Sequence, residues 1–161
     1  MTNRAVLLTL FVLFPGIAFS QTSPIDGVWK ITEVVTTGET PASNTTPQPS
    51  LVIFARGHYS WLSLSGTTPR KQAAPAQGAF TDADKIARYE EWAPLTANSG
   101  TFEVKGTTVT RRLLVAKNVN AMNASAPQQL TFKLEGDTLW LTGPQPGNPK
   151  NETRFKLTRV K

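Results

Sequence analysis

The sequence predicts a mostly β domain. Short segments rich in β-branched and aromatic residues follow one another from residue 27 onward, and several are separated by brief glycine-containing turns, at 55–57, 105–106 and 135–137. By contrast, one segment alone, at 81–92, combines capping residues with helical spacing of apolar side chains. Many short strands joined by hairpin turns are typical of a β-sandwich or a closed β-barrel.

The first twenty residues have the features of a secretory signal peptide. Arg4 supplies a positive charge, Ala5–Phe14 is an apolar run broken only by Thr9, and Ala18-Phe19-Ser20 places small residues around a cleavage site. The run has ten residues, whereas a membrane-spanning helix needs about twenty, so a permanent anchor is the weaker alternative. We predict a signal peptide at 1–20, one domain at 21–161, export to the periplasm or outside the cell, and no stable membrane insertion after cleavage.

Eight strands are expected, and most of their connections are short. The predicted strands are Gly27–Val35, Leu51–Phe54, His58–Leu64, Gly100–Lys105, Thr107–Ala116, Gln128–Leu134, Thr138–Thr142 and Thr153–Val160. The segment Thr36–Ser50 has no apolar residue larger than alanine, so it is expected to be a surface loop. Loops of this length are uncommon and are often functional.

The single predicted helix runs from about Thr81 to Trp92. Thr81 or Asp82 can accept hydrogen bonds from the free N–H groups of the first turn, and the helix ends before Pro94. Ile86, Tyr89 and Ala93 recur at helical spacing, which predicts that they form a packing stripe.

Composition argues against several classes of function. The chain has no cysteine and a single histidine, His58, at a hairpin turn, so neither a zinc site nor a Ser-His-Asp hydrolase is favoured, and no cofactor is expected. The formal net charge is +6, but the positive residues are scattered and Arg70-Lys71 and Arg111-Arg112 are the only adjacent pairs. Nucleic-acid binding is therefore not expected, because it would require a basic stripe with interleaved aromatic residues.

Several motifs, in order, resemble those of a known family. Gly27-Val28-Trp29-Lys30-Ile31 resembles the G-x-W opening of lipocalins and of the bacterial lipocalin-like domains. The hairpin at 51–60, the segment Ser99–Val104 and the turn Leu134–Leu141 are also similar to that family. The resemblance implies an eight-stranded antiparallel up-and-down barrel with a central cavity. Two positions depart from the family pattern: Arg111-Arg112 stand where histidine is frequent, and Glu33 where a small residue is usual.

The barrel expectation assigns roles to individual side chains. Trp29 is expected to plug one end of the barrel, with Arg159 across its indole ring, although direct ligand contact by Trp29 is an alternative. Glu33 shares strand parity with Trp29, and Arg111 shares it with Val109, so both charges would enter the barrel unless a register slip places one in solvent. The candidate cavity residues are Glu33, Tyr59, Trp61, Phe102, Arg111 and Phe132.

Three functions remain open on sequence alone. The leading hypothesis is that the barrel binds a small apolar or amphipathic molecule, with the Thr36–Ser50 loop as a lid. The second is an isomerase, cyclase or lyase, for which Glu33 is the candidate general acid or base. The third is an envelope or interaction module whose barrel is filled with side chains.

Overall fold

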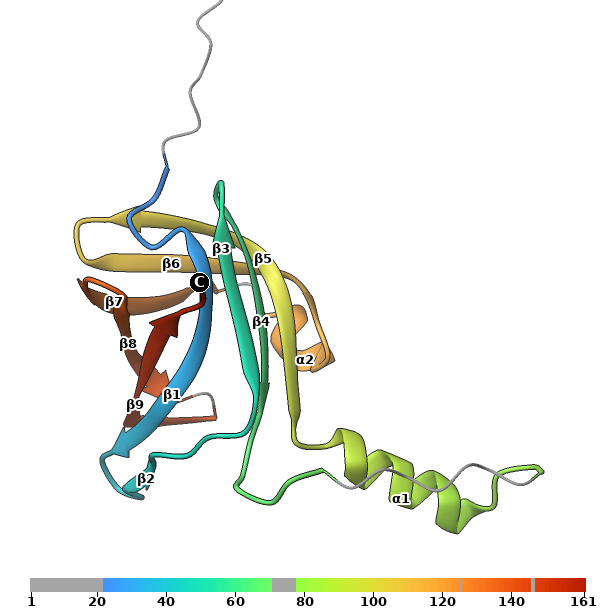
Figure 1. Ribbon diagram of the computed structural model, residues 1–161. Helices are drawn as coiled ribbons and strands as arrows, with labels where there is room; N and C mark the ends of the chain where they lie inside the picture. The colour runs from blue at the N-terminus through green and yellow to red at the C-terminus, as the bar shows by residue number, and fades with distance from the viewer. Residues whose placement is uncertain (1–21, 71–77, 125, 146) are drawn as a thin grey trace, which may run out of the picture.

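A computed structural model describes residues 22–70, 78–124, 126–145 and 147–161, and the predicted signal peptide lies outside these described residues. The eight main strands are β1 (Gly27–Thr37), β3 (Ser50–Ala55), β4 (His58–Leu64), β5 (Leu95–Lys105), β6 (Thr108–Ala116), β7 (Gln128–Glu135), β8 (Thr138–Gln145) and β9 (Asn148–Arg159). They are antiparallel, each pairs with the next, and β9 pairs with β1 (Figure 1). The protein is therefore a closed, eight-stranded up-and-down barrel, as the sequence predicts.

Three smaller elements accompany the barrel in the described part of the chain. The short strand β2 (Ala42–Asn44) pairs with the end of β1, inside the segment for which a loop was expected. Helix α1 (Asp82–Trp92) is the predicted helix, and α2 (Val119–Met122) is a single turn that is not predicted from the sequence.

The barrel has two unlike ends because its connections differ in length. The β3–β4, β5–β6 and β7–β8 hairpins turn tightly at one end, and each turn has a glycine with positive φ: Gly57, Gly106 and Gly136. The longer connections, which carry β2, α1 and α2, meet at the opposite end. We call the first the filled end and the second the open end.

The filled end is closed by packed side chains. Trp29 is fully buried, its indole nitrogen donates to the Ile25 carbonyl at 2.9 Å, and the Arg159 guanidinium lies 4.1 Å from its ring centroid. The stacking expected of Trp29 and Arg159 is therefore present. The other fully or almost fully buried apolar side chains are Ile25, Val52, Phe54, Val109, Leu139, Leu141 and Leu157.

A β-bulge in β1 changes which side chains face inward. Trp29 and Ile31 are buried and inward, but the pairing with β9 shifts between Ile31 and Glu33. After this shift Val34 faces the interior and Glu33 pairs with Arg154, whose side chain is 52% exposed. The prediction that Glu33 points into the barrel is therefore wrong, because a bulged residue reverses the alternation of every residue that follows it.

Three strands, β5, β8 and β9, extend beyond their predicted ends by three residues or more. β5 begins at Leu95 rather than Gly100, because Leu95–Ser99 pairs with Ser60–Leu64 of β4. Between the predicted strands Thr138–Thr142 and Thr153–Val160, β8 continues to Gln145, β9 begins at Asn148, and Pro144 pairs with Glu152. Pairing between β7 and β8 ends at Thr142, so at Pro144 the side of β8 that faces β7 forms no backbone hydrogen bonds. A strand tolerates proline at such a position, because proline has no N–H to donate.

Helix α1 does not pack on the barrel in the manner its sequence predicts. Thr81 is the N-cap, and its hydroxyl accepts from the backbone N–H of Asp84 in a capping box. The helix extends away from the barrel wall (Figure 1), and none of its residues is buried. The expected packing stripe is wrong, since Ile86 is 59% exposed and Tyr89 is 74% exposed.

Candidate functional site

A cavity of about 1080 Å³ lies in the open half of the barrel. Its walls come from strands on all sides and from the connections at the open end, including β2, Pro47 and Gln48 after β2, and residues 65–67 after β4. The barrel is thus packed with side chains at one end and hollow at the other.

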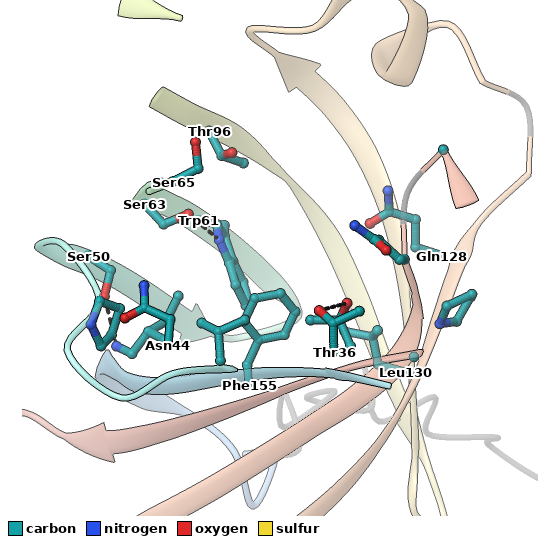
Figure 2. Close-up of a pocket in the computed structure, with 18 of the residues that line it drawn as sticks. Thr36, Asn44, Ser50, Trp61, Ser63, Ser65, Thr96, Gln128, Leu130 and Phe155 are labelled. Atoms are coloured by element: carbon teal, nitrogen blue, oxygen red, sulfur yellow. Dashed lines mark hydrogen bonds between the residues drawn. The ribbon is translucent and has the colours of Figure 1, made fainter. Parts of the chain in front are cut away.

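The floor of the cavity consists of lining residues that also pack on the buried core. Trp61 and Phe155 meet there edge to face, with ring centroids 5.1 Å apart, and the Trp61 indole nitrogen donates to the Ser63 hydroxyl at 3.1 Å. Figure 2 shows these two rings together, with Asn44 and Ser50 to one side and Gln128 to the other. We define the cavity floor as Ile31, Trp61, Arg111, Leu130 and Phe155.

The walls above the floor are mainly small and polar, but uncharged. They include serine, threonine, asparagine and glutamine side chains such as Ser63, Thr96, Asn98 and Gln128. Thr36 and Thr153 hydrogen bond to each other across β1 and β9 at 3.2 Å. Arg111 is the only charged residue among the described residues that line the cavity.

Arg111 is buried in the floor, with 9% of its surface exposed. It projects inward from β6, between its strand neighbours Phe102 and Gln128. Its Nη2 donates to Gln128 Oε1 at 2.8 Å, and its guanidinium carbon lies 5.1 Å from the ring centroids of both Tyr59 and Trp61. The cation therefore rests between two aromatic faces, an arrangement that stabilises a desolvated guanidinium.

The β5–β6 pairing beside Arg111 requires a glycine. The register shifts between Ser99 and Gly100, and a Cβ at Gly100 would overlap the carbonyl oxygen of Arg112. Any larger residue would force the two strands apart at this point. Gly100 thereby helps to keep Arg111 in its inward position, while Arg112 faces outward and is exposed.

The electrostatic environment of the floor is unusual for a cation. The Arg111 Nε and Nη1 atoms are buried and have no hydrogen-bond partner, and no carboxylate forms an ion pair with Arg111 in the described residues. Burial lowers the pKa of Arg111, an effect that Tyr59 opposes. Burial likewise raises the pKa of Tyr59, so its hydroxyl, which also has no partner, stays protonated at neutral pH.

The six candidate cavity residues divide into three groups. Trp61 and Arg111 line the cavity. Tyr59, Phe102 and Phe132 pack in or against the buried core and do not line it; Phe102, for example, meets Phe54 edge to face at 5.0 Å. Glu33 faces outward, so it neither lines the cavity nor pairs with Arg111.

Sequence reasoning missed a polar cluster at the open end. Asn151 is 1% exposed; its Nδ2 donates to Gln145 Oε1 at 2.7 Å and to the Thr40 hydroxyl, and its Oδ1 accepts from the Thr40 N–H at 3.2 Å. These bonds attach the segment after β1 to the β8–β9 hairpin. The sequence had no signal for this role, because Asn151 lies in a glycine- and proline-rich stretch that reads as a loop.

The described residues contain no group of three or more His, Cys, Asp or Glu side chains that could hold a metal ion. No helix among them is long and apolar enough to cross a bilayer.

Comparison of the sequence with protein-family models and with curated proteins finds no match in either case.

Proposed function

We propose that this protein is an exported, lipocalin-like barrel that binds a small, largely apolar molecule in the cavity of its open half. The observation that carries the proposal is the cavity itself. Its volume of about 1080 Å³ exceeds the lower limit of roughly 300 Å³ for small-molecule sites, and its floor is mostly apolar. The G-x-W opening at Gly27–Trp29 and the later motifs support the lipocalin-like assignment.

The competing hypotheses have less support. A filled barrel fits only the half that contains Trp29, Phe54 and Leu139. An isomerase, cyclase or lyase needs an acid or base beside its substrate, and Glu33, the proposed residue, lies outside the cavity. No other described Asp, Glu or His lines the cavity in its place.

Calorimetric titration with 1-decanol, a neutral amphipathic probe, tests the proposal. We expect saturable 1:1 binding to the wild type and at least tenfold weaker binding to Val34→Trp, which places a large ring inside the cavity. Val35→Trp is the matched control, because Val35 is the next residue along β1 and does not line the cavity. Absence of decanol binding to the wild type, or equal binding to both variants, would show that the cavity is not the site.

A further inference from the structure

The cavity floor contains a buried cation that has no counterion among the residues the structure describes. No carboxylate among the described residues neutralises Arg111, and the other described residues that line the cavity are uncharged. A charge is costly to remove from water unless it is paired, and arginine stays protonated even when its pKa falls. The Gln128 hydrogen bond and the two aromatic faces offset only part of that cost, since Nε and Nη1 have no partner.

We propose that the molecule bound in the cavity carries a carboxylate, which forms an ion pair with Arg111 at the floor. The inference rests on the proposed function and identifies the chemical class of the ligand. The anionic group would lie at the closed inner end of the cavity, and the apolar part of the molecule would lie against Ile31, Leu130 and Phe155.

The hydrogen-bonding capacity of Arg111 fits a carboxylate. A guanidinium has five N–H donors, and the structure uses one of the two Nη2 hydrogens for Gln128. The two Nη2 hydrogens lie on different edges of the guanidinium, one next to the Nε hydrogen and the other next to an Nη1 hydrogen. Neither Nε nor Nη1 has a hydrogen-bond partner, so the edge that Gln128 does not use is free. One complete two-donor edge therefore remains for a bidentate partner. Nε and Nη1 are enclosed in the ligand-free protein, so the proposed binding requires the guanidinium to turn this edge toward the cavity.

A carboxylate fits the site better than a phosphate. The floor offers one cation, and its other four residues are apolar or aromatic. A single carboxylate neutralises that cation completely, whereas a dianionic phosphate would bring an unpaired negative charge to a desolvated site. The planar carboxylate also matches the two-donor edge of arginine.

The test compares decanoate with 1-decanol, which have chains of the same length. We expect the wild type to bind decanoate at least about tenfold more tightly than decanol at pH 7.5, as a desolvated charge-assisted pair implies. Arg111→Gln should abolish this preference, so that decanoate binds no more tightly than decanol to the same variant. Arg112→Gln is the control for charge, because it removes the same charge from the exposed side of the same strand.

A second measurement separates a binding role from a structural one. If the role of Arg111 is to bind an anionic ligand, Arg111→Leu should leave the thermal midpoint of the ligand-free protein unchanged or raise that midpoint. The reason is that the substitution removes a buried, unpaired charge. In the wild type, the decanoate preference should also disappear as the pH falls below about 4, where the carboxylic acid is protonated.

The outcomes distinguish this inference from the proposed function. Decanol that binds the wild type as tightly as decanoate, or a decanoate preference that survives in folded Arg111→Gln, would overturn the inference and leave the binding function intact. Failure of both probes to bind the wild type would overturn both.

Discussion

At the scale of single residues, Trp29 has several partners at the filled end. Its indole nitrogen donates to the Ile25 carbonyl, the Arg159 guanidinium lies over its ring, and none of its surface is exposed. Arg159 is held in turn, because its Nη1 donates to the Asp26 carbonyl at 2.9 Å. The stacked pair contributes about 0.5–2 kcal/mol beyond the burial of the ring.

Truncation of Trp29 should therefore strongly destabilise the barrel. We expect Trp29→Ala to lower the free energy of unfolding by about 3–5 kcal/mol, because it removes a large buried aromatic ring. Urea denaturation measures this change. Trp140→Ala is the matched control, since Trp140 lies on β8 between the inward residues Leu139 and Leu141, is only partly buried and has Lys133 over its ring. A loss at Trp29 no larger than that at Trp140 would contradict a closing role.

Glu33 and Arg111 show how much a single residue's direction depends on its strand. Both were expected inside the barrel because each shares parity with an apolar residue of its own strand. Arg111 lies inside, since β6 keeps its alternation from Val109 to Arg111. Glu33 lies outside, because the bulge next to it inverts the alternation of β1.

At the scale of elements, the open end depends on polar contacts between segments distant in the sequence. Asn151 of β9 connects Thr40, in the connection between β1 and β2, to Gln145 of β8. β2 itself pairs with only three residues of β1, at Val34–Thr36. Ala42–Asn44, Pro47 and Gln48 line the cavity, so we propose that the connection between β1 and β3 acts as the lid expected of the Thr36–Ser50 segment.

Removal of the Asn151 side chain should loosen this connection. We expect Asn151→Ala to lower the free energy of unfolding by about 1–3 kcal/mol, because it leaves buried hydrogen-bonding groups without partners. It should also accelerate dissociation of decanol, measured by stopped-flow fluorescence. Asn148→Ala is the control, because the Asn148 side chain forms one local bond, to the Lys150 N–H. Unchanged dissociation in Asn151→Ala would argue against a lid.

Helix α1, also at the scale of elements, has the predicted start but not the predicted packing. Its N-terminus begins where the capping residues predict, because a capping box depends on neighbours in the sequence. Its apolar residues meet no partner on the barrel, because the structure attaches the helix near its C-terminal end, where Ser65 donates to the Pro94 carbonyl.

At the scale of the whole molecule, closure depends on the β1–β9 seam and on the contacts at its filled end. Asp137, in the β7–β8 turn, pairs with Lys161 at 2.8 Å, and its carbonyl accepts from the Arg159 N–H at 2.9 Å. The hydrogen bond and charge of Lys161 lower the pKa of Asp137, and Asp137 raises the pKa of Lys161. The last residues of the chain are thereby joined to the turn beside them.

The pH dependence of stability should report this ion pair. The folded pKa of Asp137 is lowered, so its contribution is complete above the unfolded value of about 3.9 and is lost as the pH falls through the folded value. The raised pKa of Lys161 predicts the opposite limit, a loss as the pH rises through its folded value, above about 10.4. The difference in urea midpoint between wild type and Asp137→Asn should be positive and small at pH 7 and should vanish at low pH. At high pH it should fall to the part that Arg159 supplies, whose Nε lies 3.7 Å from Asp137 Oδ1 and which stays charged. A difference constant with pH would contradict the assignment.

The sequence alone determined the fold class and most of the strands. The alternation of apolar residues, the glycine turns and the capping residues act over two to five neighbours, so they can be interpreted without the fold. For this reason β4, the hairpin turns and the start of α1 agree with the expected positions. The inward direction of Arg111 followed from the same alternation.

Only the tertiary structure decided which residues form the cavity. Pairing with strands distant in the sequence extended β5, carried β9 back to Asn148 and placed a bulge beside Glu33. Those registers determine whether a side chain faces the core, the cavity or solvent, because a shift of one residue exchanges the two faces of a strand. The sequence could suggest a buried arginine, but whether a described carboxylate lies near Arg111 depends on every strand that surrounds it.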